Sequence, residues 1–221
     1  MTIEKEVTMK RIIAATRNEG KIREMNAITE ELGISIISRD AAGVPPVEIE
    51  ETGSTFEENS YIKAKAIMDM TGEPALADDS GICCDYLGGA PGVQSARWSG
   101  GDDEDNNAKL VRLTKDVPEE ERIARYVCVM TLVFPDGETL RARGEVEGMI
   151  ITEPRGEGGF GYDPYFVPRG EGVAAGESRT FAEFPAEEKN AISHRGRALQ
   201  EMARLLRERS EKDADKAQEK E

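Results

Sequence analysis

The run ARYVCVMTLVF, at residues 124–134, constrains the fold more than any other segment. Successive side chains of a β-strand point to opposite faces of a sheet. Apolar residues stand at both alternating positions here, so a strand in this place has to be covered on both faces, as is typical of a central strand. The chain must therefore build a sheet around this segment.

Short apolar runs alternate with amphipathic segments through the rest of the chain. The pattern predicts strands at residues 11–15, 34–37, 74–77 and 82–86, and helices at residues 22–32, 54–70, 103–113, 186–190 and from 193 onward. Pro135–Gly137 is predicted to be the turn of a hairpin, because polar and apolar residues alternate after it. This order of elements predicts an α/β fold.

Composition limits the class of protein. The 221 residues carry a formal net charge of -15, whereas a nucleic-acid binder needs a basic face that releases counterions. No apolar run approaches the roughly 20 residues of a membrane span, and the N-terminus has no signal-peptide pattern. We therefore expect a cytoplasmic protein without nucleic-acid or membrane partners, whose three cysteines (Cys83, Cys84 and Cys128) are reduced thiols.

No repeat or low-complexity linker divides the chain. We expect a single domain over residues 9–209, with an extension at residues 1–8 before it. Residues 211–221 consist almost entirely of Glu, Asp, Lys, Ala and Gln, and we expect residues 210–221 to form a frayed or disordered tail.

Two adjacent carboxylates, Asp78 and Asp79, follow the apolar run that ends at Ala77, and Ser80 and Gly81 come next. Neighbours on an extended backbone point to opposite sides, so the two carboxylates should have different roles. One could face a metal ion while the other is held by backbone or basic groups, which leaves a carboxylate to bind or deprotonate a water. Asp, Ser and Gly also favour turns, and on these residues alone a turn is the preferred interpretation.

The predicted first strand leads through the loop TRNEGK, residues 16–21, into a helix. Such an arrangement can aim backbone N–H groups and a helix N-terminus at an anion. The loop lacks the second glycine and the Lys-Ser/Thr pair of a Walker A motif, so an ordinary turn with a surface lysine remains an equal alternative. Lys63 lies on a partly apolar helix face, from which it either extends to solvent or reaches an anion in a cleft.

A second glycine-rich loop, PRGEGGFGYDP, spans residues 154–164. Its glycines allow backbone to approach a ligand, and Phe160 and Tyr162 offer flat faces for a base. The alternative is a flexible loop whose aromatic residues fold over the core. Lys189, His194 and Arg195 gather near the start of the last helix, where cations are disfavoured unless an anion is present.

Several motifs in series resemble the Ham1/RdgB-like family, the inosine triphosphate pyrophosphatases. They are Thr16-x-Asn18-x-x-Lys21, Glu51-Thr52-Gly53-x-Thr55-Phe56-x-Glu58-Asn59, Lys63-Ala64, Ala77-Asp78-Asp79-Ser80-Gly81, Leu87-Gly88-Gly89-Ala90-Pro91-Gly92, Gly158-Gly159-Phe160-Gly161-Tyr162-Asp163-Pro164 and Ser193-His194-Arg195-Gly196. The match runs in order from about Arg11 to Arg207. Each motif is weak alone, but the series is specific.

The resemblance implies a Mg²⁺-dependent homodimeric enzyme that cleaves noncanonical purine nucleoside triphosphates (ITP, dITP and XTP) to the monophosphate and pyrophosphate. It implies two α/β lobes around a long mixed sheet flanked by helices, with the active site in the cleft between the lobes. By the same match, Asp79 resembles the catalytic base, and Glu51, Asp79 and Asp78 the metal ligands. The residues implied to bind substrate are Thr16, Asn18, Lys21, Lys63, Ser80, Phe160, Gly161, Tyr162, Asp163, Lys189, His194 and Arg195, of which Lys63 and Lys189 resemble phosphate-side cations.

Two other functions stay open at this point. One is a nucleotide-binding sensor that kept the pocket and lost hydrolysis, although the intact Glu51, Asp78 and Asp79 argue against it. The other is a related pyrophosphatase that acts on modified pyrimidine nucleotides. The sequence does not reveal which aspartate binds metal, how many metals bind, how GTP is excluded, or the role of the adjacent pair Cys83 and Cys84.

Overall fold

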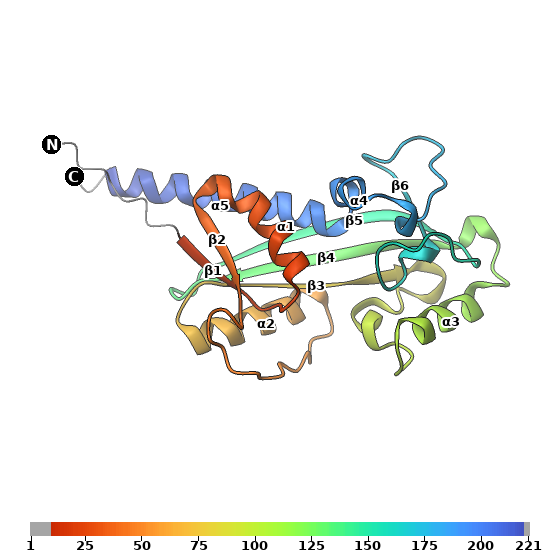
Figure 1. Ribbon diagram of the computed structural model, residues 1–221, viewed down its shortest axis with the longest axis horizontal. Coiled ribbons are helices and arrows are strands. Elements are labelled where there is room, and N and C mark those ends of the chain that lie inside the picture. The colour runs from red at the N-terminus through yellow and green to blue at the C-terminus, as the bar shows by residue number, and fades with distance from the viewer. Residues whose placement is uncertain (1–9, 219–221) are drawn as a thin grey trace. The chain divides into compact units, whose positions relative to one another are not determined.

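A six-stranded mixed sheet, in the order β2-β1-β3-β4-β5-β6, organises the computed structural model, which describes residues 10–218 (Figure 1). The strands are β1 (Lys10–Ala14), β2 (Ile34–Ser38), β3 (Ala75–Cys84), β4 (Ile123–Val133), β5 (Thr139–Ile150) and β6 (Phe166–Arg169). The helices are α1 (Glu19–Thr29), α2 (Phe56–Thr71), α3 (Asp103–Thr114), α4 (Ala186–Ile192) and α5 (His194–Gln218). β1 pairs in parallel with β2 and β3, whereas β5 and β6 are antiparallel.

The chain divides into two compact units. Among the described residues, unit 1 comprises 10–78, 130–142 and 199–218, and unit 2 comprises 79–129 and 143–198. β3, β4, β5 and α5 each contribute residues to both units. The boundary in β3 falls between Asp78 and Asp79, so the two adjacent carboxylates belong to different units.

Unit 1 places α2 against its strands. Ile67 of α2 packs with Ile13 of β1 and Ala75 of β3, and Ala64 packs with Ala77 and Val133. Thr55 caps the N-terminus of α2, since its hydroxyl accepts the N–H of Glu58. The helix ends at Gly72, whose φ of 68° is a left-handed conformation that favours glycine.

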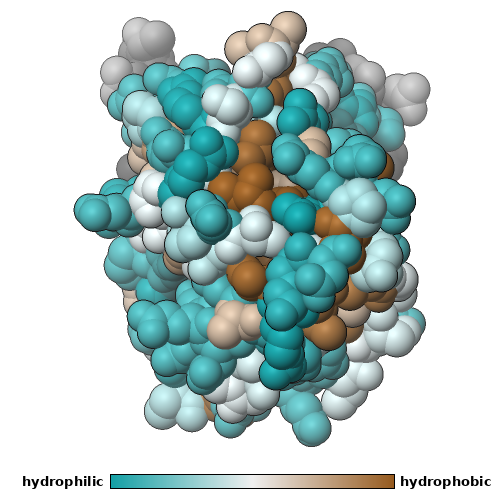
Figure 2. Space-filling view, turned by 90° about the vertical axis from the view of Figure 1, so that its right-hand side faces the viewer, coloured by the Kyte–Doolittle hydropathy of each residue, from teal (hydrophilic) through white to brown (hydrophobic). Residues whose placement is uncertain are grey.

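Unit 2 has an aromatic core. Tyr126 of β4 meets Phe166 of β6 edge to face, with ring centroids 4.8 Å apart, and Phe166 lies 5.2 Å from Phe181. Gly148 of β5 is needed here, because a Cβ atom would collide with the Phe166 ring. Figure 2, which looks onto the side of the fold that carries α3, shows a strip of apolar residues bordered by hydrophilic ones.

Most predicted elements are present, and several differ. The apolar run at residues 124–134 is β4, a strand within the sheet, as predicted. The prediction of a loop at residues 78–81 is wrong, because β3 continues unbroken through these residues. β6 was not predicted, and the charged segment expected to be disordered from residue 210 is helical as far as Gln218. Residues 1–9, which include the expected extension at residues 1–8, and residues 219–221 lie outside the described part.

Within residues 10–218, no helix is both long and apolar enough to cross a membrane.

Candidate active site

The loop after β1 is held in shape by its own side chains. Asn18 caps α1, since its Oδ1 accepts the backbone N–H groups of Gly20 (2.9 Å) and Lys21 (3.2 Å). The N–H of Asn18 in turn donates to Thr16 Oγ1 at 3.1 Å. Asn18 thus accepts hydrogen bonds from two of the free N–H groups at the helix N-terminus. The loop presents Thr16 and Lys21 beside it.

A cavity of about 190 Å³, here called the lysine cavity, lies in unit 1. It is lined by Ala15, Thr16, Lys21, Lys63, Ala77 and Asp78. Lys21 reaches it from α1, Asp78 from β3 and Lys63 from α2, so three elements deliver charged groups to one place. The sequence predicted these three residues as site residues, and the structure brings them together.

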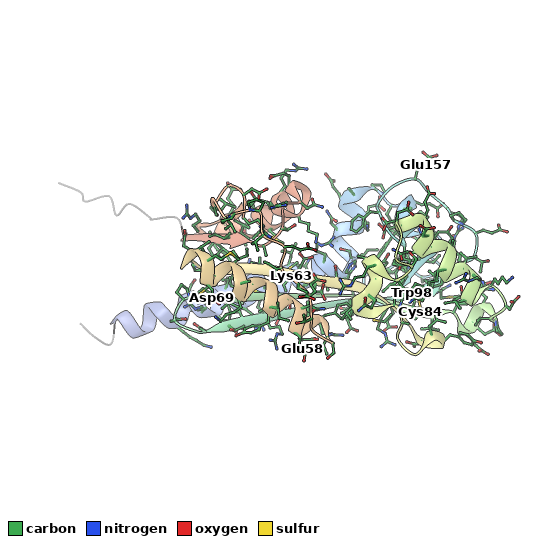
Figure 3. The ribbon with its side chains drawn as sticks, turned by 90° about the horizontal axis from the view of Figure 1, so that it is seen from below. Glu58, Lys63, Asp69, Cys84, Trp98 and Glu157 are labelled. Atoms are coloured by element: carbon green, nitrogen blue, oxygen red, sulfur yellow. The ribbon has the colours of Figure 1, made fainter. Side chains whose placement is uncertain are left out.

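Each lysine of the cavity has a carboxylate partner. Lys21 Nζ lies 2.7 Å from Asp78 Oδ2, and the Asp78 side chain is only 5% exposed. Lys63 Nζ lies 2.5 Å from Glu51 Oε1, with both side chains about one-fifth exposed. Figure 3 shows Lys63 on α2 between Glu58 and Asp69. The cavity therefore holds cations whose charge is locally balanced by Asp78 and Glu51.

The segment that carries Glu51 is fixed to the start of α2. Gly53 N–H donates to Asn59 Oδ1 at 2.8 Å, and a Cβ on Gly53 would lie only 2.6 Å from that oxygen. Both the N–H and the hydroxyl of Ser54 donate to Glu58 Oε2, and these hydrogen bonds lower the pKa of Glu58. Glu58 and Asn59 thereby restrict the loop that delivers Glu51 to Lys63.

The carboxylates suit a hard divalent cation. Mg²⁺ prefers oxygen ligands and in nucleotide enzymes is held by one or two carboxylates together with phosphate oxygens. Glu51 is paired with Lys63, and Lys63 and Asp78 line the same cavity. Within the described residues, no group of three His, Cys, Asp or Glu side chains could hold a metal. Glu51 and Asp78 thus offer oxygen ligands of the type that Mg²⁺ accepts, and in this structure each of them is paired with a lysine.

A second cluster, here called the Asp163 cluster, lies in unit 2 and comprises Phe160, Gly161, Asp163, Lys189 and Arg195. Asp163 is 2% exposed and accepts hydrogen bonds from Lys189 Nζ (2.6 Å) and the backbone N–H of Phe160 (2.9 Å). The Phe160 ring is 61% exposed, and the charged groups of Lys189 and Arg195 lie 5.1 and 5.7 Å from its centre. The cluster offers an exposed aromatic face beside two cations.

α3 holds the glycine of this loop from both sides. The N–H of Gly161 donates to Asp103 Oδ2 at 3.1 Å, and Asn107 Nδ2 donates to Gly161 O at 3.0 Å. Asp103 and Asn107 are four residues apart and so face the same side of the helix. Both polar groups of Gly161 are thereby fixed.

Tyr126 connects this cluster to the core. Its hydroxyl donates to Asp163 Oδ1 at 3.4 Å, and its ring stacks on His194 with centroids 4.7 Å apart. Burial, reinforced by the charge of Asp163, raises the pKa of Tyr126 well above its ordinary value. The phenol therefore stays protonated and serves as a donor.

The structure changes the interpretation of two predicted residues, Tyr162 and Lys189, and it also gives the burial of Asp79 and Ser80. Tyr162 does not offer a face to a base: it is 5% exposed, its hydroxyl donates to Ser95 O at 2.8 Å, and burial raises its pKa. Lys189, predicted on the phosphate side, is paired with Asp163 in unit 2. Asp79 is 8% exposed on β3, and Ser80 next to it is half-buried.

Sequence reasoning did not single out Tyr126, Asp103 or Asn107 as part of this site. The only available signal was the four-residue spacing of Asp103 and Asn107 at the start of a predicted helix. Their partners are more than 35 residues away along the chain, and no local pattern reports such contacts.

Residues 12–205 match the Ham1 family. A dITP/XTP pyrophosphatase of Symbiobacterium thermophilum is 51% identical over 193 residues, which cover 87% of this chain and 93% of the relative. A dITP/XTP pyrophosphatase of Escherichia coli O157:H7 is 45% identical, covering 90% of this chain and 99% of the relative. The solved structure of a HAM1 protein from Coxiella burnetii is similar, with a TM-score of 0.81 and 41% identity over 90% of this chain and all of that chain.

Proposed function

Because the chain belongs to the Ham1 family, we propose that it hydrolyses noncanonical purine nucleoside triphosphates (ITP, dITP and XTP) to nucleoside monophosphate and pyrophosphate. The observation that carries the proposal is the lysine cavity, where Lys21, Lys63 and Asp78 converge from three elements. Relatives named dITP/XTP pyrophosphatases support the choice of substrate. The cytoplasm, where the nucleotide pool is found, is the proposed location.

The lysine cavity binds the triphosphate in this proposal. A triphosphate carries about four negative charges, and an in-line attack requires those charges to be held and neutralised. Lys21 and Lys63 supply cations, while Thr16 and Asn18 position the loop that presents Lys21. A few cations concentrated in one cavity can bind a polyanion although the chain has a net charge of -15.

Asp79 is the proposed general base. It takes a proton from the water that attacks the α-phosphorus, while the bond to the leaving pyrophosphate breaks. Ser80, the next residue, contacts the substrate. Glu51 and Asp78, with Asp79, would hold Mg²⁺, which when bound offsets phosphate charge and lowers the pKa of a coordinated water.

The Asp163 cluster is proposed to select the base. Phe160 offers an exposed ring for stacking, and Arg195, with His194 and backbone N–H groups, offers donors. The six-position keto oxygen of hypoxanthine or xanthine accepts a hydrogen bond, whereas the amino group of adenine is itself a donor. Sites that leave donors unpaired reject the wrong partner by about 10⁴. Guanine shares the keto group, so it must be rejected through its two-amino group, which would be left unpaired or would clash near residues 160–163.

An assay panel tests the reaction. ITP, XTP, GTP, ATP and a modified dUTP are incubated with the enzyme and Mg²⁺, and pyrophosphate is measured separately from orthophosphate. We expect pyrophosphate from ITP and XTP, little turnover of ATP and GTP, and loss of activity when a chelator removes the metal. Preferred turnover of the modified pyrimidine, or binding of ITP without any turnover, would contradict the proposal and favour the pyrimidine enzyme or the sensor.

The variant Asp79→Asn tests the assigned base. Removing a general base lowers turnover by about 10² to 10⁴, and ITP binding, followed by calorimetry, should be largely kept. Asp116→Asn is the matched control, because Asp116 is an exposed carboxylate after α3 in the same unit. If Asp79→Asn turned over ITP at the wild-type rate, the role assigned to this carboxylate would be wrong.

A further inference from the structure

A second cavity in unit 1, here called the arginine pocket, has no role in the proposal above. Its volume is about 510 Å³, and its charged lining consists of Arg17, Arg39, Lys63 and Glu48. Ala15 and Lys63 line both this pocket and the lysine cavity. The two cavities therefore share a border, and the arginine pocket adds two arginines next to the proposed phosphate site.

Arg39, which follows β2 directly, is the unusual residue of this pocket. The residue is 6% exposed, and its Nη2 donates to the backbone oxygens of Val47 (2.6 Å) and Pro45 (3.2 Å). Its Nε is buried and finds no acceptor within the described part of the chain, where no carboxylate pairs with the guanidinium either. A buried cation without an opposite charge is unfavourable unless another group supplies that charge.

The other two cations of the pocket already have carboxylate partners. Arg17 is about half exposed and donates to Asp40 Oδ1 at 3.1 Å, and Lys63 is paired with Glu51. The pocket lining itself contains three cations and the single carboxylate of Glu48. Among the three cations of the lining, Arg39 is therefore the one without a carboxylate partner in the described part of the chain, and an anion that enters the pocket would supply the missing charge.

We infer that the arginine pocket binds a phosphate-class anion that adjoins the lysine cavity. Guanidinium groups match phosphate oxygens in geometry and form strong charge-assisted hydrogen bonds with them. The inference rests on the proposed function, which supplies two such anions: the terminal phosphate of the bound triphosphate and the pyrophosphate that is released. Arg39 is held by two carbonyl groups and so is oriented before the anion arrives.

Direct binding of pyrophosphate tests the pocket without any turnover. Calorimetry with Mg²⁺ compares the wild type, Arg39→Gln and Arg17→Gln, with Arg204→Gln as control, since Arg204 is an exposed arginine on α5 in unit 1. Hydrogen bonds to charged groups contribute enough that Arg39→Gln should weaken pyrophosphate binding about ten- to hundredfold. Arg17→Gln should weaken it less, and Arg204→Gln should bind as the wild type does.

The kinetics of ITP and IDP separate the two sources of the anion. If the terminal phosphate occupies the pocket, Arg39→Gln raises the KM of ITP and leaves that of IDP unchanged. If only the released pyrophosphate occupies the pocket, Arg39→Gln leaves the KM values of ITP and IDP unchanged and weakens inhibition by pyrophosphate. If a folded Arg39→Gln protein bound pyrophosphate with wild-type affinity, the inference would be overturned. The role of Arg39 would then be to hold the backbone of residues 45–47 through its hydrogen bonds. Should Arg39→Gln not fold, wild-type affinity in both Arg39→Lys and Arg17→Gln would overturn it equally.

The test also stands apart from the proposed reaction. If the protein fails to hydrolyse ITP but binds pyrophosphate in an Arg39-dependent way, the proposed function fails and the anion pocket remains. If ITP is hydrolysed while all arginine variants bind pyrophosphate equally, the pocket inference fails alone.

Discussion

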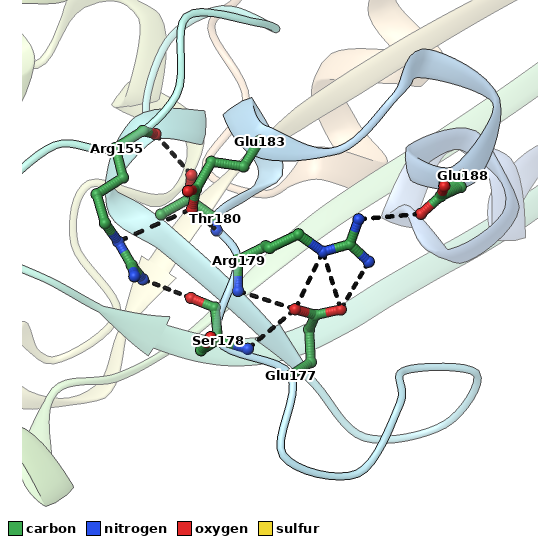
Figure 4. Close-up of polar contacts among 7 residues, drawn as sticks. All are labelled: Arg155, Glu177, Ser178, Arg179, Thr180, Glu183 and Glu188. Atoms are coloured by element: carbon green, nitrogen blue, oxygen red, sulfur yellow. Dashed lines mark hydrogen bonds and ion pairs between the residues drawn. The ribbon is translucent and has the colours of Figure 1, made fainter.

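Glu177 shows how strongly one carboxylate in this protein can be held. It accepts the backbone N–H groups of Ser178 and Arg179, both at 2.9 Å, and the Arg179 guanidinium lies 2.8 Å away (Figure 4). Arg179 also donates to Glu188 of α4 at 3.2 Å. The hydrogen bonds from the Arg179 side chain and backbone lower the pKa of Glu177 to about 2, from an ordinary value of 4.5.

The shift of Glu177 predicts a dependence of stability on pH. A carboxylate whose pKa is lowered by folding stabilises the native state above its unfolded pKa, and this contribution is lost as pH falls through the folded pKa. The wild type should therefore lose its stability advantage over Glu177→Gln as pH falls from about 4.5 to about 2. Thermal unfolding of both proteins across this range measures the difference, and an advantage that persists unchanged at pH 2 would contradict the assignment.

At the scale of single residues, the sequence predicted which residues belong to the candidate site better than it predicted how exposed each side chain is. Lys21, Lys63 and Asp78 were predicted as site residues and line one cavity. Tyr162 was predicted to offer a face to a base. Instead, Tyr162 is buried, and its hydroxyl donates to the backbone oxygen of Ser95, 67 residues away. A residue's type limits what it can do, whereas its exposure is set by long-range packing that a local pattern does not contain.

The two hydrogen bonds that hold Gly161 on α3, from Asn107 and to Asp103, give a prediction at the scale of elements. Asn107→Ala removes the donor to Gly161 O, and one hydrogen bond contributes about 0.5–1.5 kcal/mol, so we expect the KM of ITP to rise about two- to tenfold. The value of kcat should stay unchanged, because the phosphate groups and Asp79 are untouched. Steady-state kinetics measure this split.

Glu104→Ala is the control for Asn107→Ala, as Glu104 is an exposed residue of the same helix. Asn107→Ala is expected to retain a wild-type melting temperature within a few degrees. A fall in kcat at constant KM would show that α3 does not act through the base-binding loop.

Elements with strong local signals were predicted well. Thr55 caps α2, and the hydroxyl of Ser193 accepts the N–H of Gly196 at the start of α5. Such capping depends only on residues close in sequence, so the positions of these helices follow from local patterns. β3 was split in the prediction, because Asp78, Asp79, Ser80 and Gly81 have low strand propensity. Its pairing in the sheet and the close approach of Gly81 to Ser95 override that propensity.

At the scale of the whole molecule, the family resemblance predicts a homodimer. Static light scattering behind size-exclusion chromatography should then give a mass twice the 24.3 kDa of the chain. A mass of one chain at micromolar concentration would contradict this expectation while leaving the proposed reaction in place.

The buried carboxylate of Asp163 has a consequence for laboratory evolution. It joins Tyr126 of β4, Lys189 of α4 and the backbone of the loop that carries Phe160, so three distant parts of the sequence meet on one side chain. Libraries that randomise only the positions around the exposed ring would leave this anchor intact and explore small adjustments. Mutants that accept a differently shaped nucleobase should arise more often when positions 126 and 189 are diversified together with position 160.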